Sequence, residues 1–365
     1  MKNLEKLLLC LVWILLINCS SPEREKEIST IDFSEPEFIN EGIGDWIQVE
    51  KNIQLSIPDS IILGKVLQIE FSESEIFLLE SGVNVNILVF DRDGSYQRRI
   101  FKSGNGPGEY SQIDFFMMGE SSILVYDRSS QKFINYSLSD FSDFQEFRAS
   151  DYFVGGVAGL KGDRLFLISD SDSEVGLYKG YGFSNSDLTQ INYSPERVGY
   201  IEAFLPQSIS QQGSERFLMQ SFSEKVFRIT QDSLMLINEI DFGSKKIPDE
   251  IASLSDAFEF YEALEAGSYY FAVHNFLSRD GLVAFNFFNE TIDNLNFALI
   301  LNGQAYRFSI DSDLGELFFK PIAVREGLFH SVLLPGEYDE EAVRLLNLSK
   351  VDYEKPILVS YSIGQ

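Results

Sequence analysis

Cysteine and histidine are nearly absent from this sequence, which has two of each among 365 residues. Cys10 lies inside an apolar stretch at the start of the chain, so removal of that stretch would leave Cys19 as the last cysteine. No disulfide framework can then form within the chain. His274 and His330 are too few for a histidine-rich zinc or iron site, although a mixed site of histidine and carboxylate is not excluded.

Basic residues are scarce as well. Lys and Arg total 29 against 56 Asp and Glu, which gives a formal net charge of -27. Such an excess of negative charge repels nucleic acids and anionic lipid surfaces, so we exclude nucleic acid as a partner. An acidic surface of this kind keeps an exported domain soluble.

The longest apolar run stands near the N-terminus and is too short to cross a bilayer comfortably. It extends from Leu7 to Ile17, follows Lys2 and Lys6, and is closely followed by Cys19. The pattern predicts a signal peptide over residues 1–18. Residues 16–19, which end at Cys19, resemble a bacterial lipobox whose cysteine is acylated. A signal peptide cleaved nearby with a soluble product, and an uncleaved anchor, are the alternatives.

A polar stretch separates this leader from the first apolar strand pattern. Residues 20–27 contain nothing to bury, and we expect residues 19–45 to form a flexible tether, with the folded domain spanning residues 46–365. Acidic residues directly behind Cys19 resemble the export signal of Bacteroidetes surface lipoproteins. The expected location is therefore the outer membrane, with the domain facing the periplasm or the cell surface.

The domain itself is rich in aromatic residues, at 14%, and its apolar residues fall in short β-like runs. Four such runs between Val66 and Phe101 form one predicted meander, and four more between Ile113 and Arg148 form a second. The second strands of six successive units start at intervals close to the ~40 to 50 residues of a propeller blade. These starts are Ile76, Ile123, Leu165, Phe217, Val283 and Leu328.

We therefore predict an all-β fold, a six-bladed β-propeller of four-stranded antiparallel blades. The sixth unit has strands at 317–325, 328–334 and 356–363, and its missing fourth strand is supplied by residues 46–55, which closes the ring. Short helical insertions are expected near 248–265 and 337–348. A two-sheet sandwich or a pair of β domains is the competing fold, but no linker divides the chain.

One distinctive motif joins the first two meanders. Its glycines permit positive φ angles and its proline fixes its own φ, which favours a compact structural turn. An anion cradle is the functional alternative, although no phosphate-loop Lys or following helix is present. The residues of interest are Gly104, Gly106, Pro107, Gly108, Glu109 and Tyr110.

This motif, GNGPGEY, follows the strand pair NILVFDRDGSYQRRIF, and the chain has a lipoprotein-like leader and a late PILVSYSI strand. In these features the sequence resembles the Bacteroidetes lipoproteins known as the 6-bladed β-propeller family, which are similar in blade style to NHL-repeat and TolB-like propellers. The resemblance implies the fold and a cell-envelope location, and it implies no reaction.

The predicted function is therefore a ligand-binding or protein-interaction scaffold, with a glycan, peptide or protein as ligand and a link to glycan or nutrient uptake. Five residues of the predicted blades are candidate ligand contacts, and ordinary blade packing is the competing interpretation of each. They are Tyr269, Tyr270, His274, Arg325 and His330.

The alternative function is a carbohydrate-active or metal-assisted hydrolase or lyase that uses the central tunnel. The sequence offers no Gly-x-Ser-x-Gly elbow and too many carboxylates to single out a pair. We assign no catalytic residue, no metal ligand and no cofactor, and a divalent cation remains an option. Activity is accordingly left open, with non-enzymatic binding preferred.

Overall fold

The structure is a computed structural model. It describes residues 28–82, 85–148, 153–161, 164–170, 180–185, 188, 191–196, 206–279, 281–347 and 352–364. The expected signal peptide, Cys19 and the first part of the expected tether lie outside the described residues.

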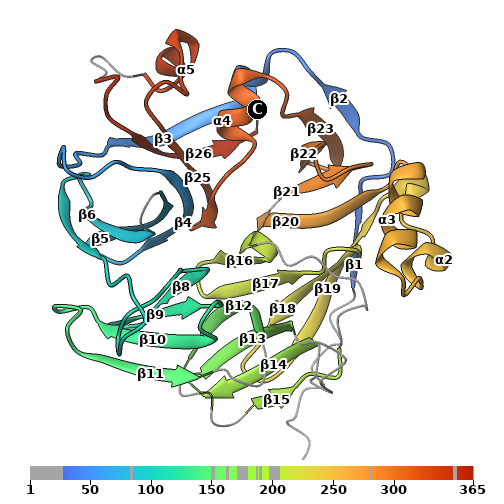
Figure 1. Cartoon of the computed structure of the whole chain (residues 1–365). Coiled ribbons are helices and arrows are strands. Elements are labelled where there is room, and N and C mark those ends of the chain that lie inside the picture. The colour runs from blue at the N-terminus through green and yellow to red at the C-terminus, as the bar shows by residue number, and fades with distance from the viewer. Residues whose placement is uncertain are drawn as a thin grey trace, which may run out of the picture.

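Six sheets surround a common centre, and the first three blades are each built from four consecutive strands (Figure 1). Blade 1 contains β4 (Lys65–Phe71), β5 (Glu75–Ser81), β6 (Asn86–Asp91) and β7 (Tyr96–Ile100). Blade 2 contains β8 (Phe115–Met118), β9 (Ser122–Asp127), β10 (Lys132–Ser137) and β11 (Phe144–Arg148). Blade 3 contains β12 (Phe153–Leu160), β13 (Arg164–Asp170), β14 (Gly180–Asn185) and β15 (Ile191–Tyr193).

The other three blades each receive a strand from the N-terminal part of the chain. Blade 4 contains β16 (Ile209–Gln212), β17 (Glu215–Met219), β18 (Lys225–Ile229) and β19 (Leu234–Asp241), with β1 (Ser29–Asp32) added parallel to β19. Blade 5 contains β20 (Tyr270–Arg279), β21 (Leu282–Asn289), β22 (Leu295–Leu301) and β23 (Gln304–Ser309), with β2 (Glu37–Ile39) added parallel to β23. Blade 6 contains β24 (Ala323–Arg325), β25 (Leu328–Leu333), β26 (Ile357–Ile363) and β3 (Ile47–Gln54).

The predicted fold class is confirmed. All six residues chosen from the sequence as starts of second strands lie in the second strand of a blade, and the meanders of blades 1 and 2 match the expected runs closely. Ring closure by the N-terminal strand is also as expected, because β3 pairs antiparallel with β26 from Ile47 to Gln54. The sheet edge of blade 6 is thereby covered.

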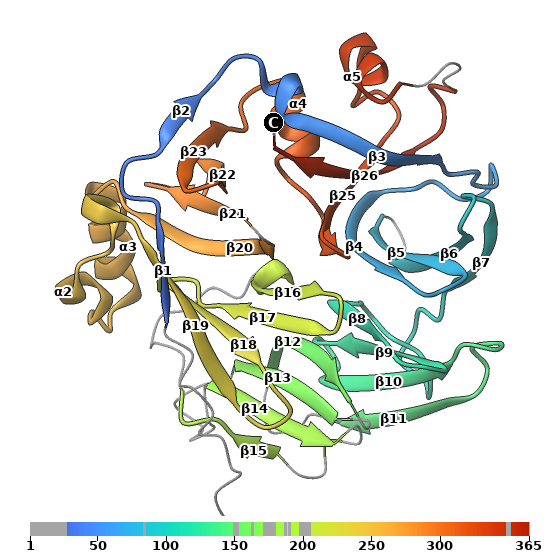
Figure 2. The same cartoon turned by 180° about the vertical axis from the view of Figure 1, so that it is seen from behind.

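Residues 29–45 differ from the expected flexible tether. β1 and β2 run along the outer strands of blades 4 and 5 (Figure 2). Phe33 is fully buried between them against the rings of Phe242, Phe285 and Phe287. The segment has no clear apolar pattern in the sequence because each added strand is short and the buried side chains Ile31, Phe33 and Ile43 are widely spaced.

The start of blade 6 also differs from the prediction of a strand over residues 317–325. The first part of that segment belongs to helix α4 (Asp313–Phe318), and only Ala323–Arg325 forms a strand. Ser312 caps the helix by accepting a hydrogen bond from the Gly315 amide at 3.0 Å. A good N-cap therefore outweighs the β propensity of the Phe-rich run that follows.

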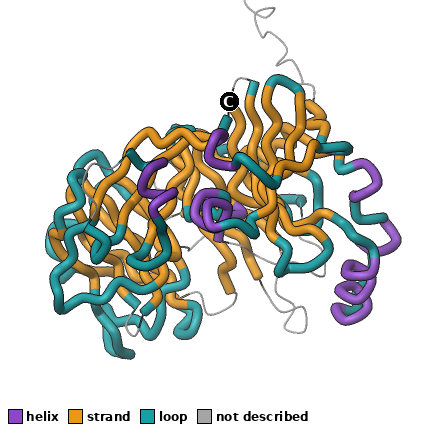
Figure 3. The backbone as a smooth tube through the Cα atoms, turned by 90° about the horizontal axis from the view of Figure 1, so that it is seen from above, coloured by secondary structure: helices purple, strands orange, loops and turns teal. Residues whose placement is uncertain are grey.

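Both predicted insertions are helical, and all helices are short (Figure 3). The first insertion forms α2 (Asp249–Ala252) and α3 (Ala257–Ala266) between β19 and β20, and the second forms α5 (Glu340–Leu345) between β25 and β26. Three 3-10 turns complete the described elements: η1 (Ile43–Trp46), η3 (Pro206–Ser208) and η4 (Gly243–Lys245). No helix among the described residues is long and apolar enough to cross a membrane.

The middle strands are apolar on both faces because each blade packs between two others. In β5, Phe77 and Leu79 join the core shared with blade 2, whereas Ile76 and Leu78 join the core shared with blade 6. Successive side chains of a strand point to opposite faces, so a continuous apolar run is what a blade interior requires. This packing fixes the inner strands that surround the centre of the ring.

A candidate ligand site at the centre of the ring

The inner strands of the blades enclose a central cavity of about 390 Å³. Its wall includes residues from β4, β8, β12, β16, β20 and β24, so all six blades contribute. The volume lies at the lower end of the range that is usual for small-ligand sites. The centre of the ring can therefore hold a small molecule or one side chain of a larger partner.

Glycine forms part of the wall that blade 3 contributes. Gly155, Gly156 and Gly159 of β12 line the cavity, and a Cβ atom on Gly159 would come within 3.0 Å of the Met117 sulfur. These glycines let blades 2 and 3 approach closely and leave room beside their backbone. The space in the ring centre is thus partly a product of the sequence FVGGVAGL.

Two charged residues pair across the junction of blades 1 and 6. Arg325 Nη2 donates to Glu70 Oε1 at 2.5 Å and Arg325 Nε donates to Glu70 Oε2 at 3.3 Å. The pair is bidentate and its side chains are largely buried, at 19% and 14% exposed. Such geometry fixes both groups firmly at the cavity wall.

A second arginine, Arg216 of β17, lies in the same wall. Its only side-chain hydrogen bond among the described residues runs from Nη1 to the Ser214 carbonyl at 3.2 Å. Burial lowers the pKa of Arg216, the positive charge of Arg325 lowers it further, and Glu70 acts in the opposite direction. The charge of Arg325 therefore acts on Arg216. Glu70, the ion-pair partner of Arg325, also acts on Arg216.

The other carboxylate of the wall, Asp114, is held by local hydrogen bonds. It accepts the Arg128 backbone amide at 2.8 Å and the Gln112 side-chain amide at 2.9 Å. Glu70 likewise accepts from Gln68 at 3.1 Å in addition to its bond with Arg325. Both carboxylates of the cavity wall are thus occupied by protein donors.

Two glutamines lock neighbouring inner strands together. Gln68 donates to the Phe116 carbonyl at 2.7 Å and accepts the Phe116 amide at 3.0 Å, which joins blades 1 and 2. Gln212 joins blades 4 and 5 in the same way, through the Phe276 carbonyl at 3.3 Å and the Ser278 amide at 3.2 Å. These side chains stiffen the cavity wall by satisfying backbone groups that face another blade.

Of the five candidate contacts from the sequence, Arg325 alone lies in the cavity wall. Tyr270 is buried against Phe33, Phe242 and Phe287, between blades 4 and 5. Tyr269 packs against the core cluster beneath helix α3. Both tyrosines serve blade packing in this structure.

The two histidines are buried outside the cavity wall. His274 Nδ1 contacts the Ala272 carbonyl at 2.7 Å, and its ring stacks on Phe288. His330 contacts the Ser360 hydroxyl at 2.9 Å and packs on Phe71. Burial lowers the pKa of each to about 4, so both are neutral at pH 7. No cluster of three or more possible metal ligands occurs among the residues that the structure describes.

The turn motif lies between β7 and β8, at the periphery of blades 1 and 2. Glu109 folds back so that its Oε2 accepts the Gly106 amide at 2.8 Å, and Tyr110 donates its hydroxyl to the Ile100 carbonyl at 3.1 Å. Burial raises the pKa of Tyr110 to about 12. Gly108 adopts φ 69°, and a Cβ there would meet the Phe144 ring.

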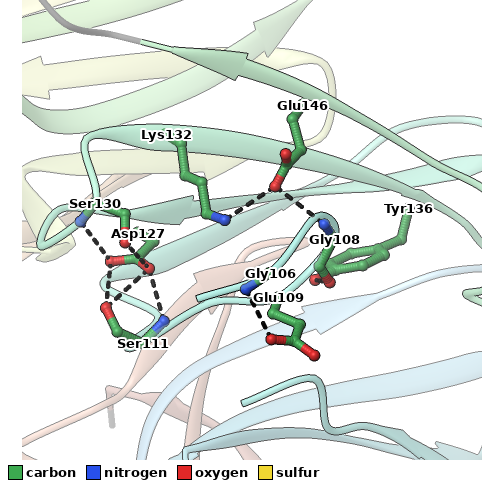
Figure 4. A network of polar contacts seen from close by, with 9 residues as sticks. All are labelled: Gly106, Gly108, Glu109, Ser111, Asp127, Ser130, Lys132, Tyr136 and Glu146. Atoms are coloured by element: carbon green, nitrogen blue, oxygen red, sulfur yellow. Dashed lines mark hydrogen bonds and ion pairs between the residues drawn. The ribbon is translucent and has the colours of Figure 1, made fainter. Parts of the chain in front are cut away.

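Side chains of blade 2 hold this turn in place through hydrogen bonds (Figure 4). Glu146 accepts the Gly108 amide at 3.0 Å and the Lys132 ammonium at 2.9 Å, while Tyr136 donates to the Gly108 carbonyl at 2.8 Å. With its polar groups bonded to protein in this way, the turn acts as a structural connector between two blades.

Asp127 anchors the residue that follows the turn. Its carboxylate accepts the Ser111 amide at 2.7 Å and the Ser130 amide at 3.1 Å (Figure 4). Burial alone would raise the pKa of Asp127, but these hydrogen bonds outweigh burial and lower it. Asp127 is the last residue of β9, and an aspartate at such a strand-to-turn junction commonly accepts backbone hydrogen bonds.

Sequence reasoning missed Glu70 and Arg216. Each is a charged residue beside an otherwise apolar stretch, in VLQIEF and ERFLM. A charge in an inner or second strand of a predicted blade was the available signal, because such strands are otherwise buried between blades. Nothing in the sequence alone indicated that blades 1, 4 and 6 bring these charges together.

Comparisons with known proteins agree with this architecture. A family model described as "6-bladed beta-propeller" matches residues 20–324. A solved structure described as a "Putative exported protein" from Bacteroides fragilis is similar with a TM-score of 0.72 at 18% identity, over 92% of this chain and 100% of that chain. No curated protein sequence matches the chain.

Virginiamycin B lyase from Staphylococcus aureus is a more distant likeness. It has a TM-score of 0.40 at 13% identity, over 72% of this chain and 74% of that one, and so carries no argument about activity. The family match, by contrast, spans most of the blades described above. The chain belongs to the 6-bladed β-propeller family.

Proposed function

We propose that this protein is an exported, lipid-anchored binding module of the bacterial cell envelope, and that its central cavity holds a small ligand or part of a partner. The ligand classes in view are a glycan, a peptide or a side chain of another protein, in keeping with a role in nutrient or glycan uptake. The observation that carries the proposal is the cavity itself, which all six blades enclose.

The leader supports export and anchoring. A positive start, an apolar run and Cys19 in lipobox-like context are what a lipoprotein precursor requires. Cys19→Ala should move the protein from the membrane fraction to the soluble fraction, whereas Cys10→Ala, in the apolar core of the leader, should leave it membrane-bound. A Cys19→Ala protein that stays wholly in the membrane fraction would contradict lipid anchoring.

The charged groups of the cavity favour binding over hydrolysis. A glycosidase needs one carboxylic acid free to give up a proton and a second group free to act on the substrate. Glu70 is tied to Arg325 and Gln68, and Asp114 to Gln112 and the Arg128 backbone. Such groups hold a wall in shape, and an open cavity with fixed charges is suited to recognition.

A thermal-shift screen of the chain from residue 20 onward tests the proposal, because a ligand that binds only the folded state raises the melting temperature. The screen should contain oligosaccharides, peptides and divalent metals. A shift with a sugar or peptide supports the binding module. A shift that requires a metal would instead favour the metal-assisted enzyme, and hydrolysis of the oligosaccharides would contradict the proposal outright.

A further inference from the structure

The cavity differs in charge from the protein around it. Its wall brings together three arginines, Arg128, Arg216 and Arg325, and two carboxylates, Asp114 and Glu70, in a chain of net charge -27. Low-dielectric walls focus the field of such groups on the space between them. An anion is therefore attracted to the centre of a molecule that otherwise repels it.

Arg216 forms no ion pair among the described residues. Glu70 is already engaged bidentately by Arg325, while the one side-chain hydrogen bond that Arg216 makes to a described residue goes to a neutral carbonyl. A half-buried guanidinium without a carboxylate contact leaves most of its N–H groups open to a ligand. Its position in the cavity wall directs that capacity to the central space.

Further positive charge lies just outside the cavity. Arg92 stacks over Phe71 at 5.2 Å, and Phe71 follows Glu70 in the wall. The charges of both Arg325 and Arg92 help to lower the pKa of His330, after burial, which places all three groups in one region. His330 is neutral at pH 7 and adds no charge of its own to this region.

We propose that the central cavity binds a small organic anion through a carboxylate group that pairs with Arg216, beside the Arg325–Glu70 ion pair. The inference rests on the proposed function and adds to it the chemical class of the ligand. A guanidinium fork matches a carboxylate in a bidentate arrangement. One carboxylate is enough to pair with Arg216, whereas a second negative charge would meet the neighbouring Glu70 carboxylate unfavourably.

Part of the cavity wall is apolar and can contact the rest of the ligand. Phe115, Met117 and Val157 are half-buried residues of the cavity wall from blades 2 and 3. They offer contacts to the apolar face of a sugar ring or to an aromatic ring. The expected ligand is thus a compact acid with an apolar face, such as an acidic monosaccharide or an aromatic acid.

The test compares acids with their neutral counterparts. The chain from residue 20 onward, which contains every strand of the propeller, is titrated calorimetrically with glucuronate against glucose and with benzoate against benzamide, at constant pH and ionic strength. At least one acid should bind, and its neutral counterpart should not. Arg216→Gln should weaken that binding about tenfold or more, as expected for loss of a charge-assisted hydrogen bond.

Two further variants keep this test specific. Arg216→Lys retains the charge and should retain part of the affinity, whereas Arg344→Gln removes an arginine whose side chain is 81% exposed on α5 and should change nothing. No binding by either acid, equal binding of acid and neutral counterpart, or unchanged affinity in Arg216→Gln would overturn the inference. A neutral sugar or peptide that still binds in the cavity would leave the proposed function standing while this inference fails.

Discussion

Blades 1–3 and blades 4–6 are built in different ways. Each of the first three consists of four strands consecutive in sequence, whereas each of the last three takes one strand from residues 29–54. We call residues 29–54 the N-terminal strap, blades 1–3 the local half and blades 4–6 the strapped half. The same blade architecture therefore depends on hairpins between strands close in sequence in one half, and on pairing between strands far apart in sequence in the other.

The strap makes three kinds of contact. β1 and β2 add parallel strands to outer edges, and β3 completes blade 6 with an antiparallel pairing to β26. Phe33 adds a fully buried ring to the interface of blades 4 and 5. Loss of these contacts should therefore affect the strapped half first.

The largest expected effect comes from removing residues 356–365. This deletion takes away β26, the strand between β25 and β3, together with the buried residues Ile357, Val359 and Tyr361. Because ring closure then fails, we expect no cooperative unfolding transition of a folded monomer, measured by circular dichroism on heating. An unchanged melting temperature would show that the ring does not depend on this closure.

Phe33→Ala should destabilise the protein by about 3 to 5 kcal/mol, because it removes a large buried ring and leaves a cavity. Phe38→Ala provides a matched control on the same strap, since Phe38 is 47% exposed and Phe33 is 0% exposed. The measurement is the free energy of unfolding in denaturant for both variants and the unaltered chain. Equal effects of the two substitutions would mean that β1 and β2 are held loosely.

As pH falls, the strapped half should lose stability at a higher pH than the local half. Both histidines lie there, with folded pKa values lowered from 6.5 to about 4 by burial, so the unfolded state binds protons more readily. Their contribution to stability is complete above pH 6.5, is lost as pH falls towards 4, and amounts to about 3 kcal/mol per histidine.

Hydrogen exchange at pH 7 and pH 5 checks this directly. Between pH 7 and pH 5, protection against exchange, relative to the intrinsic rate at each pH, should fall more in β20, β21, β25 and β26 than in β5, β6, β9 and β10. His330→Asn should reduce the change in blade 6 only. An equal loss of protection in all blades would contradict the assignment of acid sensitivity to the two histidines.

The smallest predicted effect separates backbone strain from packing in the local half. Gly108→Ala places a Cβ at φ 69° and 2.6 Å from the Phe144 ring, whereas Gly213→Ala, at φ 58°, meets nothing within 4 Å. The control variant should lose about 1 kcal/mol from strain alone, and Gly108→Ala should lose more because the ring must also move. If both variants have the same free energy of unfolding, Phe144 does not constrain the turn.

The sequence predicted the local half well because its strands are continuous in sequence and separated by turn residues such as Asp93-Gly94. It did not predict β1 and β2, since Ser29 pairs with Asn238 and Glu37 with Tyr306, and such short polar strands leave no pattern. The partners of β1 and β2 are the outer strands β19 and β23, which lie far away in the sequence.

The site was predicted less well for a different reason. β20 was expected to present His274 to the centre, but register shifts on both sides of His274 and left-handed backbone at Ala272 and Asn275 alter which side chains face inwards. Asn275 lines the cavity in its place. Bulges change the direction of side chains without leaving a clear signal in the sequence, so membership of an inner strand did not show which residues line the cavity.

If the ligand is held in the middle of the ring, a bulky side chain placed in the cavity wall should abolish its binding. Gln211 is half-buried in the cavity wall, and its side chain bonds only to the nearby Gly213 carbonyl among the described residues. Gln211→Trp should fill part of the cavity while the melting temperature of the unliganded protein stays close to that of the original chain. Calorimetric titration of the best ligand from the screen should then give strong binding to the unaltered chain and none to this variant. Equal affinity for both proteins would contradict the account and place the ligand elsewhere on the propeller.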